Sequence, residues 1–167
     1  MIYLRNIAIA LTLRNSLWLI AAIVHLPSTT YAADAFIDVS AVTNLVVAQE
    51  VLQEVIEEEG LIPGQPNHLS EMMGRTGPAL NKTQAVFQEA VLIPFCSSRH
   101  SWMLVEEDPR QLTLCPFSIG LYVLPNNPER VHITYRSPGT SSPAQHSAAE
   151  LLKKIVTITQ QRLQEQK

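Results

Sequence analysis

Residues 117–136 read FSIGLYVLPNNPERVHITYR, and this stretch decides the fold. It holds two runs rich in apolar and β-branched residues, 117–124 and 130–136, separated by Pro125-Asn126-Asn127-Pro128. Proline and asparagine favour turns, so we predict two antiparallel strands joined by a hairpin. Side chains alternate between the faces of a strand. In the second strand one face receives Val131, Ile133 and Tyr135, and the other His132, Thr134 and Arg136.

Before this hairpin the sequence predicts a strand, a helix and another strand. Residues 36–39 alternate as a short strand, and apolar residues at three- and four-residue steps then predict a helix from Asn44 to Gly60. Pro63 and Pro66 restrict any strand in 61–68 to a short edge strand. Residues 69–73 fit one helical turn, residues 74–78 a flexible loop, and residues 85–95 a central strand.

Two further helices complete the prediction. Ser97 or Ser98 caps a helix over residues 99–107, which Asp108-Pro109 stops. After a linker at 139–142, Ser147 and Glu150 form a capping box that opens the last helix. Its predicted apolar side contains Leu151, Leu152, Ile155, Ile158 and Leu163. The class is α+β, with a single mainly antiparallel sheet and helices packed on it.

The first 33 residues have the order of charges and apolar residues of a secretory signal peptide. Arg5 and Arg14 precede and flank an apolar run at 17–24, and small residues follow, so we expect cleavage near Ala32 or Ala33. No cysteine lies near that position, which argues against a lipoprotein anchor. We therefore predict an exported, periplasmic protein without a stable membrane span after cleavage. Residues 34–140 form its domain, and residues 141–167 are a C-terminal helix packed on the same domain.

Charge argues against nucleic acid as a partner. Cleavage removes two of the twelve basic residues and none of the fifteen acidic ones, so the net charge falls from −3 to −5, which is ten minus fifteen. A protein that binds a phosphate backbone needs a basic surface. The remaining chain of roughly 135 residues suffices for one domain with its own core.

Six short segments resemble a known family when their order and spacing are taken together. They are Gly60-Leu61, Met73-Gly74-Arg75-Thr76-Gly77, Phe95-Cys96-Ser97-Ser98, Asp108-Pro109, Cys115-Pro116-Phe117 and Tyr135-Arg136-Ser137-Pro138. Over residues 36–138 the chain resembles the bacterial and archaeal family called domain of unknown function 302, especially its exported branch with two cysteines. The resemblance implies a fold similar to the TATA-binding-protein-like class, without DNA binding. It brings no established activity and therefore no catalytic residues. Pro63 and Pro66 depart from the regular strand of the family.

The two cysteines, Cys96 and Cys115, allow three interpretations. In an exported protein a disulfide is favoured, and it would close a loop of about 20 residues worth about 3 kcal/mol. A redox thiol is the second, because Cys96 precedes a helix whose dipole lowers a thiol pKa. A metal or haem site is the third, with Cys96, His100 and Cys115 as ligands. Soft side chains that could join such a site are Met72, Met73 and Met103.

Arginines supply the remaining candidate site. Arg75, Thr76 and the neighbouring backbone amides could hold an anion, and Arg136 could join them. Arg99 and Arg110 are further candidates to converge there. Known catalytic motifs are absent, and His132 is predicted to be exposed rather than part of a catalytic triad.

The sequence does not identify an activity. It favours a small exported, non-catalytic binding or interaction domain stabilised by one disulfide, with a small ligand or a periplasmic protein as partner and no cofactor. The alternative is a periplasmic protein that handles redox equivalents, metal or haem through Cys96, His100 and Cys115. The sequence does not predict the ligand or the oligomeric state.

Overall fold

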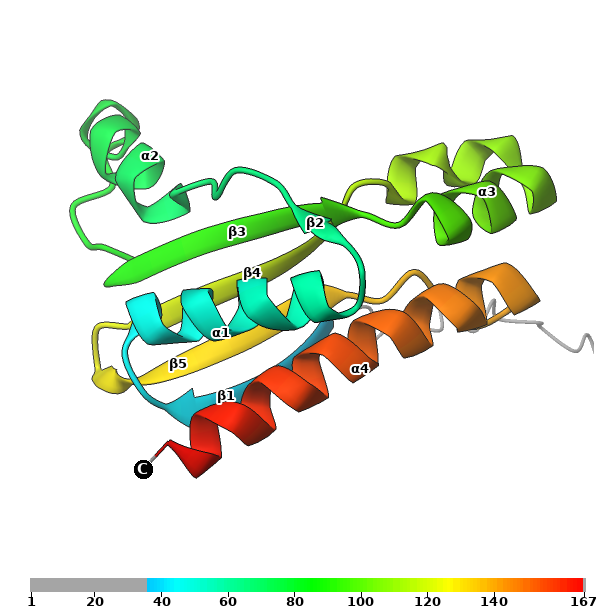
Figure 1. Ribbon diagram of the computed structural model, residues 1–167. Helices are drawn as coiled ribbons and strands as arrows, with labels where there is room; N and C mark the ends of the chain where they lie inside the picture. Colours follow the sequence, from blue (N-terminus) through cyan, green and yellow to red (C-terminus); the bar gives the residue numbers. More distant parts are fainter. Residues whose placement is uncertain (1–35, 167) are drawn as a thin grey trace, which may run out of the picture. The chain divides into compact units, whose positions relative to one another are not determined.

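The computed structural model describes residues 36–166 (Figure 1). The predicted signal peptide, residues 1–33, lies outside the described residues. Within 36–166 the chain forms five strands, four α-helices and two 3-10 helices. No helix in this range combines the length and the apolarity needed to cross a membrane.

The fold is built on one antiparallel sheet. Its order is β1-β5-β4-β3-β2. The strands span Phe36–Val42 (β1), Ile62–Pro63 (β2), Glu89–Cys96 (β3), Phe117–Leu124 (β4) and Asn127–Arg136 (β5). The predicted hairpin is confirmed as β4 and β5, although β5 begins inside the predicted turn, where Leu124 pairs with Asn127. The two-residue β2 is an edge strand, as its prolines predict, so β3 lies next to the edge rather than at the centre.

Two long helices cover one face of this sheet. They are α1 (Leu45–Glu58) and α4 (Pro143–Glu165), which lie side by side in front of the strands in Figure 1. Asn44 caps α1 by accepting a hydrogen bond of 2.9 Å from the Val47 amide. Gly60, with φ of +74°, ends it. Helix α4 begins one turn before the predicted Ser147, because the Ser142 hydroxyl caps it and Pro143 fits its first turn.

The core lies between these helices and the sheet. Ile93, Ile119 and Ile133 from three adjacent strands are fully buried. They meet Leu52 and Ile56 of α1 and the apolar side of α4 within one cluster. The predicted α+β class, with its single sheet and its order of elements, is therefore confirmed.

Shorter helices follow β2 and β3. Helix α2 spans Leu69–Thr76 and is followed by the 3-10 helix η1, Pro78–Leu80. The loop predicted for 74–78 was wrong, because α2 continues through Gly74 and the Thr76 hydroxyl donates a hydrogen bond of 2.9 Å to the Met72 carbonyl. Helix α3, Ser98–Glu107, has the predicted bounds within one residue and ends at Asp108, before the 3-10 helix η2, Pro109–Leu114.

A groove beside an open sheet face

The face of the sheet opposite α1 and α4, here called the open face, has different neighbours. Helix α2 contacts β3 near Ala90, and the Ser70 hydroxyl accepts a hydrogen bond of 3.0 Å from the Ala90 amide. The Ala90 side chain is buried but lies outside the core cluster, as alternation along β3 requires. Helix α2 therefore borders the open face at the start of β3.

A groove of about 820 Å³ runs between α2, η1 and residues 82–87. Its apolar lining includes Leu69, Met72, Met73, Leu80, Val86 and Phe87. Several of these side chains are exposed, with 40% of Met72 and 56% of Val86 accessible to solvent. Helix α2 contains no fully buried residue. The apolar side chains of this segment thus face a solvent-filled groove rather than the core.

Beyond the groove, strand register gathers Asp38, Tyr122 and His132 on the open face. Tyr122 is paired with His132 across β4 and β5, and Asp38 of β1 lies opposite Thr134, two residues further along β5. The Tyr122 hydroxyl donates a hydrogen bond of 3.1 Å to Asp38 Oδ1, and His132 Nδ1 lies 2.9 Å from Asp38 Oδ2. The Tyr122 and His132 rings stack with centroids 4.6 Å apart.

The hydrogen bonds of this cluster show which of its atoms donate and which accept. An ionised carboxylate only accepts hydrogen bonds, so Nδ1 of His132 must donate to Asp38. In the neutral ring Nε2 is then an acceptor, and it has no hydrogen-bond partner among residues 36–166. Burial, followed by the hydrogen bond to Asp38 and the charge of Asp38, raises the pKa of Tyr122 to about 12. Tyr122 is therefore a neutral donor throughout the physiological range.

Phe87 connects the cluster to the groove. This residue lines the groove, and its ring centroid lies 5.5 Å from that of Tyr122, with 59° between the ring planes. Such a tilted arrangement is favourable for two aromatic rings. Phe87, Tyr122 and His132 form a row of rings that leads from the groove to the Asp38 carboxylate.

The cysteines are not joined, so the structure does not support the predicted disulfide. Both are free thiols and are not close enough to bond. Cys96 ends β3 with an exposed side chain on the open-face side of the alternation, whereas Cys115 follows η2 and packs against the core. The Cys115 sulfur lies 2.9 Å from the Ser101 hydroxyl. Their side chains thus have different neighbours.

The predicted thiol activation is also unsupported. Partial desolvation, and secondarily the charge of Cys115, raises the pKa of Cys96 despite its place before α3. A raised pKa favours the thiol over the reactive thiolate.

Of the candidate metal ligands, Cys96 and His100 line one hollow together with Arg99, and His100 already has a hydrogen-bond partner. His100 Nδ1 lies 2.8 Å from the Ser97 hydroxyl, and burial followed by the charge of Arg99 lowers the pKa of His100. Met103 packs against the core, while Met72 and Met73 lie in the groove. Within residues 36–166 no three histidine, cysteine or acidic side chains gather closely enough to hold a metal ion.

The candidate anion-binding residues lie apart. Arg75 and Thr76 are on α2, beside the start of β3, whereas Arg136 ends β5 opposite Phe36. The register of β3, β4 and β5 puts these positions at opposite ends of the sheet. Anion binding at Arg75 and Thr76 stays a prediction, but Arg136 does not converge with them.

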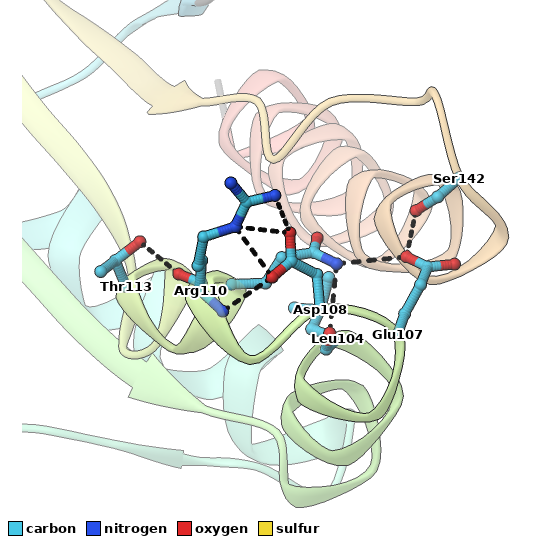
Figure 2. Close-up of polar contacts among 7 residues, drawn as sticks. Leu104, Glu107, Asp108, Arg110, Thr113 and Ser142 are labelled. Carbon is cyan, nitrogen blue, oxygen red and sulfur yellow. Dashed lines mark hydrogen bonds and ion pairs between the residues drawn. The ribbon is translucent and has the colours of Figure 1, made fainter.

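Arg110 belongs to a structural junction instead. Figure 2 shows its guanidinium held by the Asp108 carboxylate, with Nη2 of Arg110 2.8 Å from Oδ2 of Asp108. Beside this pair Glu107 of α3 accepts hydrogen bonds from Ser142, which caps α4, and from Gln111. These contacts fix α3 and η2 against the start of α4 rather than forming an anion site.

Sequence reasoning missed the Asp38–Tyr122–His132 cluster. Alternation correctly predicted that His132 lies on the face opposite Tyr135. The cluster, however, is formed by three strands, and the sequence of a single strand does not predict its register with the other two. An aspartate within a short strand was the available signal, because aspartate is depleted in strands.

Comparison with solved structures finds a likeness in fold. The chain superimposes on an uncharacterised conserved protein of the domain of unknown function 302 family from Bacillus stearothermophilus, with a TM-score of 0.60 and 17% identity over 79% of this chain and 100% of that chain. At this identity the likeness establishes the fold alone, and it is the fold that the sequence resemblance implied. The sequence matches no protein-family model and no curated protein.

Proposed function

We propose that this chain is an exported, non-catalytic binding domain of the domain of unknown function 302 family, which takes a small apolar molecule into the groove beside α2. The groove carries the proposal, since about 820 Å³ of apolar hollow lies outside the core. Binding sites for small molecules typically have volumes of about 300–1,000 Å³, mostly apolar linings and few polar groups.

The composition of the groove suits such a ligand. Its polar side chains include Ser70, Lys82, Thr83 and Gln84, which lie among the apolar ones. Met72 and Met73 are unbranched and polarisable, so they adapt to the shape of a bound molecule. The ligand would cover side chains such as Val86 and Leu80, which are exposed without it.

Methionine labelling tests binding with few signals. The chain has four methionines, and Met72 and Met73 line the groove while Met103 packs against the core. With ¹³C-methyl methionine, titration of 2-methoxynaphthalene should move the Met72 and Met73 resonances saturably and leave that of Met103 in place. Equal movement of all three, or of none, would contradict the proposal.

A matched pair of variants adds a control. Val86→Asp introduces a charge into the groove, whereas Val46→Asp introduces the same charge on α1, away from the groove. Both valines are exposed, 56% and 63% respectively, so neither change should unfold the protein. We expect Val86→Asp to abolish the methionine shifts and Val46→Asp to preserve them.

Export rests on the N-terminal sequence and on the family resemblance. Expression of the full chain in a Gram-negative host should give a periplasmic protein whose mass fits removal of residues up to Ala32 or Ala33. A full-length product retained in the cytoplasm would contradict this part of the proposal. The thiol and metal alternatives are not favoured, because the pKa of Cys96 is raised and no three histidine, cysteine or acidic side chains among residues 36–166 gather closely enough to hold a metal ion.

A further inference from the structure

We infer that the Asp38–His132 pair recognises a hydrogen-bond donor on the molecule bound in the groove. The ligand class is then an amphiphile, with an apolar body of the size of one or two rings and a hydroxyl or N–H group at one end. This inference rests on the proposed function and adds the polar half of the ligand.

The first observation is the fixed orientation of the His132 ring. Asp38 accepts from Nδ1 at 2.9 Å, which leaves Nε2 of the neutral ring as an acceptor. The Tyr122 ring, stacked at 4.6 Å and 9° to the imidazole, fixes the plane in which Nε2 lies. A carboxylate that orients an imidazole in this way is a recurrent arrangement where the second ring nitrogen binds a partner. Among residues 36–166, Nε2 has no such partner.

The second observation is the position of the pair. Phe87 belongs to the groove lining and contacts Tyr122, which contacts both His132 and Asp38. Two consecutive ring contacts therefore separate the groove from the imidazole. A molecule whose apolar body lies against Phe87 can extend along the aromatic row toward Nε2.

The third observation is that the pair is partly exposed and includes an aspartate within a strand. The Asp38 side chain is 40% and the His132 side chain 19% exposed, and a hydrogen bond between partly exposed side chains contributes little net stability. Aspartate is also unfavourable within a strand. A polar cluster that breaks the local preference without a gain in stability is typical of a functional site.

Two matched probes test the inference. 2-Naphthol and 2-methoxynaphthalene share a ring system, but only the former has an O–H donor. We expect 2-naphthol to bind about fivefold more tightly, as one neutral hydrogen bond provides. His132→Phe keeps a ring against Tyr122 and removes Nε2, so the two probes should bind it equally. His146→Phe, the control at an exposed histidine on α4, should retain the difference.

The results of the probe titrations distinguish failure of this inference from failure of the proposed function. Equal affinity of the two probes for the unaltered protein would overturn this inference and leave the groove proposal standing. Failure of both probes to bind would overturn the proposed function itself. If His132→Phe did not fold, the ¹⁵N spectrum of the unaltered protein would still decide, because the Nε2 resonance of His132 should move with 2-naphthol and not with 2-methoxynaphthalene. An unmoved Nε2 resonance at saturation with 2-naphthol would overturn the inference.

Discussion

The two faces of the sheet are built from the same strands and differ in almost every physical respect. On the covered face, Ile93, Ile119 and Ile133 are fully buried against α1 and α4. On the open face, Asp38, Tyr122 and His132 form hydrogen bonds and ring contacts while partly exposed. Adjacent residues of one strand therefore serve different purposes.

The two faces therefore differ in role: the apolar contacts that stabilise the fold lie on the covered face, and the polar side chains available for binding lie on the open face. Apolar burial on the covered face is non-directional and sums over many side chains. The open-face contacts are few and directional, and they involve side chains from three strands. The groove beside α2 meets the sheet on the open-face side through Phe87. The covered face thus accounts for stability, and the open face holds the candidate site.

The largest expected effect compares neighbours in β5. Ile133→Ala should lower the free energy of unfolding by about 3–4 kcal/mol, because it leaves a cavity in the core. His132→Ala, one residue away on the open face, should lower it by about 1 kcal/mol or less. Urea denaturation measures both values. A comparable decrease in the free energy of unfolding at the two positions would show that side chains of the open face also stabilise the fold.

A change at Asp38 tests the electrostatics of the open face. The folded protein retains the Tyr122 proton up to about pH 12, whereas the unfolded chain loses it near pH 10. The contribution of Tyr122 to stability is therefore complete below pH 10 and is lost as the pH rises toward 12. Asp38→Asn should lower the pKa of Tyr122 partway toward 10, since burial, the larger cause, remains. NMR of ¹³C-labelled tyrosine, with Tyr122→Phe for assignment, gives the value.

Tyr135 is the control on the covered side of the same sheet. Burial and then Glu150 raise the pKa of Tyr135, and Asp38 is not among the causes. Its titration should be the same in Asp38→Asn. An unchanged pKa of Tyr122 in this variant would show that Asp38 does not act on the phenol.

The same contrast explains which features of the fold and of the candidate site could be predicted from the sequence. Alternation in 130–136 predicted which side chains of β5 face the core, and Asp108-Pro109 predicted the end of α3. The start of α3 agrees within one residue, although the Ser97 hydroxyl contacts His100 instead of capping a backbone amide. The partners of His132 could not be predicted, because Asp38 and Tyr122 lie 94 and 10 residues away and only strand register brings them together. The cysteine pairing failed for a related reason, since sequence proximity and export say nothing about where each sulfur lies.

Thiol labelling compares Cys96, at the end of β3, with Cys115, which packs against the core. Cys96 is exposed, whereas Cys115 packs against the core beside Ser101. A maleimide should therefore modify Cys96 several times faster than Cys115, as mass spectrometry of the native protein would show. Because partial desolvation and the charge of Cys115 raise the pKa of Cys96, its labelling rate should keep rising with pH beyond the range where the labelling rate of a free cysteine levels off.

The control is the denatured chain, in which the two cysteines should react alike. Complete protection of both thiols in the native protein, released only by a reductant, would establish a disulfide and contradict the structure.

The smallest effect is expected at a site that belongs to neither face. Arg110 and Asp108 form an exposed ion pair at the junction of α3 and η2, with 91% of the arginine side chain accessible. Charges in such a position are well hydrated whether or not they are paired. Arg110→Ala should therefore leave the urea midpoint unchanged within the error of the measurement. This variant provides the baseline for the open face. If His132→Ala lowers the free energy of unfolding clearly more than Arg110→Ala does, the stacking of His132 on Tyr122 and its bond to Asp38 stabilise the fold. Equal effects of the two variants would leave ligand binding as the only role of the Asp38–His132 pair.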